Sequence, residues 1–477
     1  MRALSWRRAG AALACATLLA GCSLIPSYQR PPAPIPAAYP AQQDSPDGAA
    51  PARITADSGW REFFPDQRLQ AWLTAALANN RDLRTAALRI EEARALYDIQ
   101  WSERLPNINA AASAQRVRTP AGTSPVGTAL VANTYQVGLN LAAFELDFFG
   151  RVRSLSEAAL AQYLATEEAH RSARISLVAE VAKAYLAERA FAEQLELAQR
   201  TLASREQAYR LAQQRFEVGA SSALDLRQSE VLVQTARVAQ ATLARQRAQA
   251  QNALALLAGT PLADLPAPQT LAAQDIETGI PAGLPSELLA RRPDIRASEQ
   301  RLMAANANIG AARAAFFPRI SLTAGLGTAS RELSGLFEAG SASWSFVPQL
   351  ALPIFDAGRN RANLDLAQVR RNIAVADYEK AIQQAFREVA DALVARAALD
   401  EQIEAQRLVQ EAQAARLELA DQRYRNGIAS SLDVLDAERE LFSAQQSLVQ
   451  ARLLRLTNAI DLYRALGGGL VAESPRH

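Results

Sequence analysis

An internal duplication constrains the fold of this chain more than any other feature of its sequence. Asp82-Leu83-Arg84 reappears as Asp294-Ile295-Arg296, and Leu105-Pro106-Asn107-Ile108 as Phe317-Pro318-Arg319-Ile320, both 212 residues later. Beyond these the offset is 208, and it joins Gly150-Arg151 to Gly358-Arg359, Gln214-Arg215-Phe216 to Gln422-Arg423-Tyr424, Gly219 to Gly427, Ser222 to Ser430, Leu224-Asp225 to Leu432-Asp433 and Glu230 to Glu438. Such a steady offset indicates two copies of one structural unit. We expect the four-residue change in offset to lie in the loops between strands.

Each copy is predicted to contain a helix, two strands and two long helices. In 318–327, apolar residues at every second position alternate with serine, threonine and glycine, and 106–115, 135–141 and 346–354 show weaker versions of this pattern. Alternation with one apolar face is typical of a membrane β-barrel. A soluble, half-buried hairpin gives the same pattern, so the strands alone leave both interpretations open.

The long helices are predicted from uninterrupted stretches of helix-forming residues. No proline or glycine occurs in 151–218 or in 359–426, and each stretch corresponds to roughly 100 Å of helix at 1.5 Å per residue. In 435–463 apolar residues recur every seven positions, as in a coiled coil. Gly219 and Gly427 follow these stretches as left-handed helix ends do. We therefore predict two long helical hairpins with tight tips.

The N-terminus is predicted to be a lipoprotein signal. Arg2, Arg7 and Arg8 precede a short apolar run, which ends in Leu19-Ala20-Gly21-Cys22 and resembles a bacterial lipobox. The resemblance implies cleavage before Cys22 and a covalent N-acyl and S-diacylglycerol lipid, such as one carrying palmitate, on that cysteine. Ser23 in place of an aspartate favours the outer membrane. The alternative is an ordinary signal peptide with an incidental cysteine.

Composition excludes several functions. The chain has 51 basic and 49 acidic side chains, and removal of the signal also removes three arginines, so no basic excess points to nucleic acid. Cys22 would be the last remaining cysteine, and the two histidines are His170 and His477, so we expect neither a disulfide nor a metal site. The sequence has no phosphate loop or nucleophile elbow. We therefore expect no enzymatic activity and no cofactor besides the lipid.

The sequence is divided into segments at changes of pattern. We predict a signal peptide at 1–21, an acylated Pro-rich tether at 22–58, a helical and equatorial segment at 59–105, a first barrel hairpin at 106–148, a first long helical hairpin at 149–259, an equatorial crossover and helix at 260–317, a second barrel hairpin at 318–356, a second long helical hairpin at 357–470 and a tail at 471–477.

Membrane insertion would require several chains. No stretch of about 20 apolar residues follows the signal, so any crossing would have to use β-strands. Four strands cannot close a transmembrane barrel, because the known ones have at least about 8. Three copies supply about 12 strands, whereas two would form a barrel filled by side chains. This argument favours three or more copies in a ring, without selecting three.

Several motifs then match a known family. They are Gly283-Leu284-Pro285-Ser286-Glu287-Leu288-Leu289, Arg291-Arg292-Pro293-Asp294-Ile295-Arg296, Ala304 to Gly310, Phe316-Phe317-Pro318, Phe355-Asp356-x-Gly358-Arg359 and Leu462 to Gly469. From about Trp60 to Gly469 the chain resembles the TolC-type outer-membrane factors, lipoprotein branch of tripartite (RND) multidrug efflux systems. The resemblance implies an α+β membrane protein, with a trimeric 12-stranded β-barrel, four strands per chain, continued by a long α-helical coiled-coil periplasmic tunnel.

The resemblance also implies partners and a location. These are a homotrimer, a periplasmic adaptor protein, an inner-membrane RND-type transporter and outer-membrane lipid. The protein would be lipid-anchored in the outer membrane and extend into the periplasm. An adaptor would contact the hairpin tips at Phe216, Gly219 and Gly427.

A periplasmic gate is implied at the second hairpin tip. The residues that align with the family's gate are Leu432, Asp433, Asp436, Tyr424, Arg439 and, in the first copy, Asp225. Asp225 and Asp433 also stand three residues after Ser222 and Ser430, so helix capping alone would explain both. Asp436 differs, because Gln228 occupies the corresponding position of the first copy. Ala429 stands where some members carry an arginine, which argues against the family's full ion-pair latch.

The leading hypothesis is a passive exit duct for drugs or other small solutes, driven by an inner-membrane transporter. A type I protein-secretion duct would have the same fold. A non-conducting lipoprotein scaffold that spans the periplasm would need no membrane strands. The lipobox and the motifs between Pro285 and Pro318 favour efflux.

Overall fold

The computed structural model describes residues 23–39, 55, 58–125, 127–277, 281, 283 and 285–472. The predicted signal peptide, Cys22 (the predicted lipidation site), residues 473–477 and about half of the Pro-rich tether lie outside these residues. The chain forms two compact units, and the first helix of each long hairpin, α5 (Arg151–Glu217) and α9 (Arg359–Arg425), has residues in both. The first unit comprises Met1–Pro32, Arg89–Glu167 and Ala297–Tyr378, and the second comprises Ala33–Leu88, Glu168–Arg296 and Glu379–His477.

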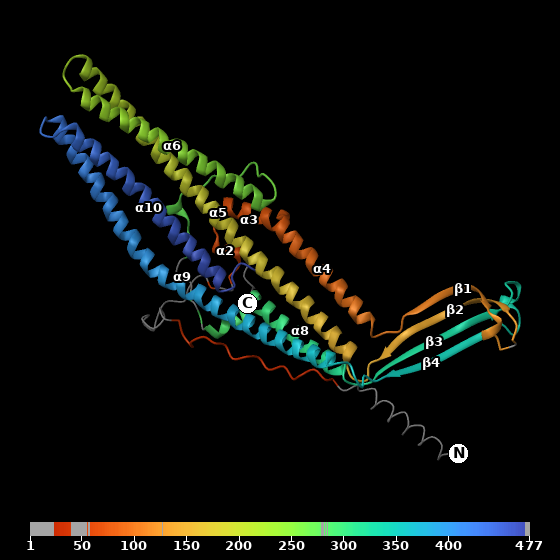
Figure 1. Cartoon of the computed structure of the whole chain (residues 1–477). Coiled ribbons are helices and arrows are strands. Elements are labelled where there is room, and N and C mark those ends of the chain that lie inside the picture. Colours follow the sequence, from red (N-terminus) through yellow and green to blue (C-terminus); the bar gives the residue numbers. More distant parts are fainter. Residues whose placement is uncertain are drawn as a thin grey trace. The chain divides into compact units, whose positions relative to one another are not determined.

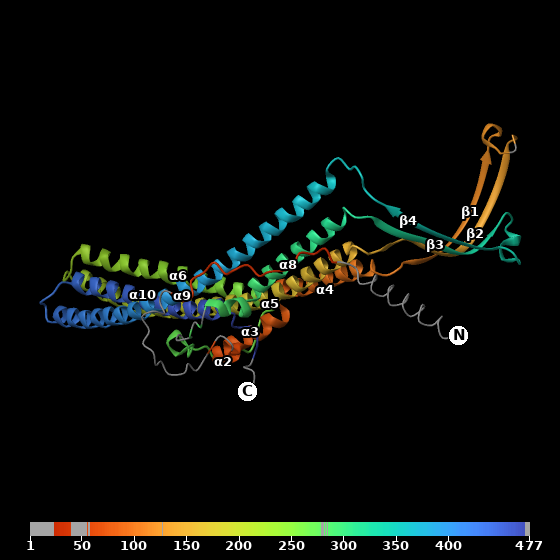
Figure 2. The same cartoon turned by 90° about the horizontal axis from the view of Figure 1, so that it is seen from below.

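The first unit contains one antiparallel sheet in the order β1-β2-β3-β4. Its strands are β1 (Ile108–Thr119), β2 (Leu130–Leu146), β3 (Arg319–Ser330) and β4 (Ala342–Ala351), which lie side by side in both views (Figure 1 and Figure 2). The β2–β3 ladder joins the two repeats. Within it, a Cβ atom at Gly327 would lie 2.2 Å from the Val137 carbonyl oxygen, so this position requires glycine.

One face of the sheet is apolar and exposed. Trp344, Phe346 and Leu350 occupy alternate positions of β4, and Leu326 pairs with Trp344 from β3. Trp344 is 78% and Leu326 is 68% exposed in the single chain. Edge strands β1 and β4 each pair with one neighbour only. The single chain therefore leaves both an apolar face and two rows of edge backbone groups without partners.

The expectation that the change in repeat offset lies in the loops between the strands is wrong. Loops 120–129 and 331–341 differ by a single residue, whereas β2 is 17 residues long and β4 is 10. A register shift between Leu141 and Phe144 also interrupts the β2–β3 ladder. The extra length is accommodated in β2 because this central strand pairs on both sides and a bulge can absorb additional residues.

The long helices occur in matched pairs. They are α5 (Arg151–Glu217) with α6 (Ala223–Ala258), and α9 (Arg359–Arg425) with α10 (Ser431–Ala465). Both α5 and α9 contain 67 residues. Ion pairs connect the antiparallel partners, for example Arg247 with Glu188 at 3.0 Å and Arg455 with Asp400 at 2.6 Å. None of the helices in the described residues is long and apolar enough to cross a membrane.

Shorter helices complete the two repeats. They are α2 (Trp60–Phe63), α3 (Gln67–Asn79), α4 (Arg81–Ser102), α7 (Leu288–Arg291) and α8 (Pro293–Ala314), with 3-10 turns η2 (Ala121–Thr123), η3 (Leu271–Ala273), η4 (Pro285–Glu287) and η5 (Ser334–Phe337). The strands lie within the two segments expected for barrel hairpins, and the four long helices lie within 149–259 and 357–470.

The core of the second unit follows the apolar stripes seen in the sequence. Val449, Leu456 and Tyr463 of the seven-residue repeat are buried, and the Tyr463 ring stacks on Phe63 at 4.1 Å. Tyr185 is fully buried and donates a 2.6 Å hydrogen bond to Asp66. Burial of this phenol beside a carboxylate raises the pKa of Tyr185 well above its ordinary value. These side chains are therefore structural.

The Arg-Arg-Pro-Asp motif also has a structural role. The buried Arg292 guanidinium pairs with Asp294 at 2.6 Å and with Glu388 of α9 at 2.8 Å. It donates a third hydrogen bond, of 3.1 Å, to the carbonyl of Ala465 at the end of α10. One buried arginine therefore joins the start of α8 to α9 and α10, and replacing it would remove two ion pairs and the Arg292 hydrogen bond to the Ala465 carbonyl.

Candidate functional site: the two helical hairpin tips

The two hairpin tips share one backbone structure. Gly219 and Gly427 both adopt φ +72°, a left-handed conformation that favours glycine. Both turns close with the same hydrogen bond: the Gly219 N–H donates to the Phe216 carbonyl and the Gly427 N–H to the Tyr424 carbonyl, each at 3.0 Å. The predicted tips are therefore present, with a common reversal that the two glycines permit.

The helices after the turns begin with equivalent capping boxes, as the sequence predicts. Ser222 caps α6 with Asp225, and Ser430 caps α10 with Asp433. The Ser430 backbone N–H donates to the Asp433 carboxylate at 3.0 Å, and the Ser222 N–H to Asp225 at 3.3 Å. The pKa of each aspartate is held below its usual value, mainly by the hydrogen bond from the serine hydroxyl and to a lesser extent by that from the serine N–H.

Asp436 has an environment that the first tip lacks. Its carboxylate accepts from Arg416 of α9 at 2.7 Å and from Arg439, one turn along α10, at 2.5 Å. The positions 208 residues earlier are Ala208, Gln228 and Val231. The second tip thus carries a three-residue charge cluster, Arg416–Asp436–Arg439, at positions where the first tip is uncharged.

Near the tips, two hydrogen bonds among the described residues connect one hairpin to the other. The Arg215 guanidinium near the end of α5 donates a short hydrogen bond to the Tyr424 hydroxyl and lies 5.4 Å from the centre of its ring. The Ser431 hydroxyl donates to Asp225 at 3.4 Å. Within the described chain, Arg439 pairs with Asp436 and with Glu440 at 3.2 Å, so its contacts are local to the second hairpin.

Sequence reasoning missed three of these groups. Arg215 belongs to a repeated motif, Gln214-Arg215-Phe216, and could have been considered for that reason. Arg416 is 20 residues from Asp436 and lies on the other helix of the pair, so no local spacing signals its contact. Ser431 follows the capping serine directly and gives no separate signal.

A groove between α6 and α10 lies beside the charge cluster. It has a volume of about 390 Å³, and its apolar lining includes Leu224, Val231, Leu432 and Leu435, with Asp436 and Arg439 at its polar side. The predicted constricting residue Leu432 is 55% exposed, and its repeat mate Leu224 is 67% exposed. The gate candidates Leu432 and Asp436 therefore share one surface.

The tips also expose large apolar side chains. Phe216, named as an adaptor contact from the sequence, is 42% exposed, and its neighbours on the turns, Val218 and Ile428, are 78% and 68% exposed. An added Cβ at Gly219 or Gly427 would meet no atom within 4 Å, so the outer side of both turns is open.

Comparison with known proteins assigns the chain to a family. The model of the outer membrane efflux protein family matches residues 72–260 and again 284–468, one match for each repeat. The chain therefore belongs to the outer membrane efflux proteins, which confirms the family inferred from the sequence motifs.

Relatives and solved structures agree with this assignment. The toluene efflux pump outer membrane protein TtgF of Pseudomonas putida is 50% identical over 469 residues, which cover 96% of each chain. Outer membrane protein OprJ of Pseudomonas aeruginosa is 49% identical over 462 residues, covering 96% of this chain and 95% of that one. The open-state crystal structure of the MtrE outer membrane channel of Neisseria gonorrhoeae matches with a TM-score of 0.87 and 43% identity, over 95% of this chain and 100% of that chain.

These matches confirm the predicted fold class, a β-barrel continued by an α-helical tunnel. The protein is an outer-membrane efflux component whose chain contributes four strands and two duplicated helical hairpins to a barrel-and-tunnel channel. The aperture, latch and adaptor roles of individual tip residues stay predictions.

Proposed function

We propose that three copies of this chain form the passive exit duct of a tripartite efflux pump. The observation that carries the proposal is the four-stranded sheet, with its exposed apolar face and two unpaired edges. Pairing β4 of one copy with β1 of the next would satisfy both edges and close a barrel of about 12 strands. Membership of the outer membrane efflux family supports the location and the transport role.

The cargo follows from the relatives by analogy. TtgF is named for toluene efflux, and other relatives are named for solvent or antibiotic efflux. We propose that this duct passes similar apolar solvents and antibiotics, together with whatever else its transporter delivers. Energy would come from an inner-membrane RND-type transporter, because the duct itself only has to open.

The second tip is proposed as the periplasmic gate. In a ring of three chains, Asp433 and Asp436 would place six carboxylates around one opening, with Leu432 as the constriction and Tyr424, Arg439 and Asp225 in the contacts that hold it. Two contacts support this assignment: the Arg215–Tyr424 hydrogen bond ties the second hairpin to the first, and the Arg416–Asp436–Arg439 cluster holds α10 against α9 beside it. A ring of carboxylates would also attract cations.

The adaptor is proposed to dock at the tips. Phe216 and the open turns at Gly219 and Gly427 expose apolar area without a partner in the single chain, and burying such area favours association. An adaptor that presents a helical hairpin could fill the adjoining groove and then bias the gate toward the open state.

The lipid anchor at Cys22 is proposed as the attachment of the N-terminus to the outer membrane. The described segment starts one residue later and lies against α8 in the first unit. Arg30 pairs with Glu299 at 2.7 Å, and Asn306 donates to the Pro26 carbonyl at 2.8 Å. These contacts would hold the anchor beside the strand-bearing unit. A Cys22→Ala variant should lack the lipid mass in intact-protein mass spectrometry.

A conductance measurement and a cell assay together test the duct. The purified lipidated protein should form discrete channels in planar bilayers, and native mass spectrometry should give three times the protomer mass. Absence of conductance, even in the Asp433→Ala and Asp436→Ala variants, would contradict the duct and favour the non-conducting periplasmic scaffold. In a deletion strain, restored resistance to solvents and antibiotics supports efflux, whereas restored secretion of a protein substrate with unchanged susceptibility would support a type I secretion duct.

A further inference from the structure

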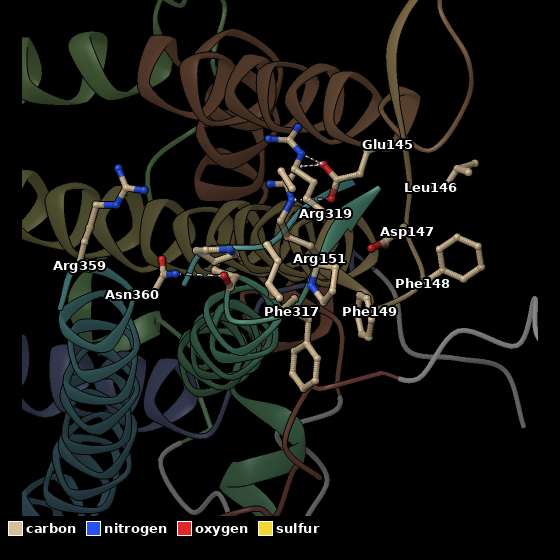
Figure 3. Close-up of a pocket in the computed structure, with 16 residues that line it drawn as sticks. Glu145, Leu146, Asp147, Phe148, Phe149, Arg151, Phe317, Arg319, Arg359 and Asn360 are labelled. Atoms are coloured by element: carbon tan, nitrogen blue, oxygen red, sulfur yellow. Dashed lines mark hydrogen bonds and ion pairs between the residues drawn. The ribbon is translucent and has the colours of Figure 1, made fainter. Parts of the chain in front are cut away.

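A polar cavity lies where the sheet meets the helices of the first unit. It has a volume of about 420 Å³ and is bounded by the end of β2, the start of β3, the end of β4 and the first turns of α5 and α9 (Figure 3). Its charged lining consists of Glu145, Asp147, Arg151, Arg319 and Arg359. In the proposed duct, these strand ends are the periplasmic ends, at the depth of the lipid headgroups.

The carboxylates of the cavity already have partners. Glu145, whose side chain is 9% exposed, accepts two hydrogen bonds of 2.8 Å from Arg151. It also accepts from Arg319 at 2.6 Å. Asp147 accepts from the Arg153 backbone N–H at 2.7 Å. Two guanidinium groups share one buried carboxylate here, so the Glu145 cluster retains one positive charge.

Arg359 adds a positive charge that is not in an ion pair among the described residues. It is the repeat mate of Arg151, but Pro353 occupies the position that corresponds to Glu145. Within the described part of the chain, no carboxylate lies within ion-pair distance of its guanidinium. Figure 3 shows Arg359 at the first turn of α9, apart from the Glu145 cluster. With Asp147 included, three arginines and two carboxylates line the cavity, so its net charge is +1, and Arg359 is exposed.

Apolar side chains continue directly from this basic site. The rings of Phe149 and Phe317 stack at 4.8 Å on the cavity wall. Leu352, also in the wall, is 50% exposed, and the next apolar residues along the chain, Ile354 and Phe355, are 92% and 90% exposed. A soluble anion would use only the arginines, whereas this surface offers an apolar flank as well.

We infer that this cavity binds the phosphate of a phospholipid from the periplasmic leaflet of the outer membrane. The inference rests on the proposed barrel function, which places these strand ends at a membrane surface. Arg359 would donate to the phosphate oxygens, while Arg151 and Arg319, held by Glu145, would add positive charge to the same cavity. The acyl chains would lie along the exposed apolar side chains and the apolar face of the sheet.

Native mass spectrometry of the full-length lipidated protein provides the test. The protein is extracted in mild detergent, stripped of lipid and titrated with phosphatidylglycerol, phosphatidylethanolamine, diacylglycerol and inorganic phosphate in separate arms. We expect one tightly held phospholipid per chain. Neither diacylglycerol nor inorganic phosphate alone should be retained. Arg359→Gln should retain the phospholipid about tenfold more weakly, as loss of a charge-assisted hydrogen bond predicts.

Arg361→Gln is the matched control. Arg361 lies two residues along α9, pairs with Asp365 at 3.3 Å and does not line the cavity. Equal retention by Arg359→Gln and Arg361→Gln would overturn the inference, and so would equal binding of diacylglycerol. If Arg359→Gln instead dissociates the oligomer, the arginine contacts a neighbouring copy and the inference also fails. Conductance of the same preparations is measured in parallel. If Arg359→Gln conducts and retains phospholipid as the wild type does, the lipid site is refuted while the proposed duct function stands.

Discussion

The two hairpin tips have the same backbone and different charges. Their turns, glycine conformations and capping boxes correspond position by position, whereas Arg416, Asp436 and Arg439 replace an alanine, a glutamine and a valine. The features that the copies share are those needed to reverse a long helix. The fold does not require the features that differ, because the first tip forms without them. A gate is therefore best sought where the second copy departs from the first.

Removing the Asp436 carboxylate should have the largest effect on this difference. Asp436→Ala eliminates two ion pairs of the second tip, together worth up to about 2 kcal/mol for partly exposed groups, so the ratio of open to closed channels should rise up to about thirtyfold. Single-channel recording measures this ratio and the block by divalent cations. Gln228→Ala is the matched change in the first tip and should alter neither; equal effects of the two would remove the special role of Asp436.

Alanine at the turn glycines should affect both tips alike. The left-handed conformation costs an L-residue about 1 kcal/mol or more, and no steric contact adds to it, so Gly219→Ala and Gly427→Ala should each speed local opening about fivefold. Hydrogen exchange of the amides in each turn reports this rate. A large difference between the two variants would show that the turns are not mechanically equivalent.

A smaller change should make the second tip resemble the first at one position. Tyr424→Phe introduces the residue type already present at Phe216, and it removes the hydroxyl that accepts from Arg215. Loss of one exposed hydrogen bond predicts a rise in open-channel ratio of about threefold. The reciprocal variant Phe216→Tyr serves as the control, and it should leave the recordings unchanged.

Acid should loosen both caps equally, with the smallest effect. The folded-state pKa of Asp225 and of Asp433 is lower than the usual value of 3.8. Their stabilising contribution is therefore complete above that value and is lost as the pH falls through the depressed folded pKa. Exchange rates at the starts of α6 and α10 should be constant from neutral pH to about pH 5 after correction for intrinsic chemistry. Asp225→Asn and Asp433→Asn should remove the acid dependence, and a dependence centred near neutrality would contradict this assignment.

The sequence specified the local elements of the tips and strands. Gly219, Gly427 and the Ser222 and Ser430 caps could be predicted because each motif is complete within a few residues. The strand pattern could be found but not its interpretation, since a lipid-facing and a core-facing strand alternate in the same way. The apolar exposure of Trp344 and Leu326 in the single chain is the observation that separates them.

Long-range contacts could not be predicted in this way. Arg416 reaches Asp436 across the α9–α10 pair, and Arg215 reaches Tyr424 from 209 residues away. Both depend on how the helices wind, which is not encoded in spacing along the chain. The position of the offset change was missed for a related reason: additional residues in β2 are tolerated by its two neighbours, and the sequence does not reveal which strand is central.

The β2–β3 ladder carries a consequence for symmetry. In the proposed ring of three chains it would alternate with β4–β1 ladders. Each β-hairpin would then pair with both neighbours in a similar way, through three ladders within chains and three between chains. A ring of identical single-repeat chains would have to change all its hairpins in concert. Fusion of two repeats into one gene product lets alternate positions around the ring evolve separately, so half of them can maintain the wall while the other half become its moving parts.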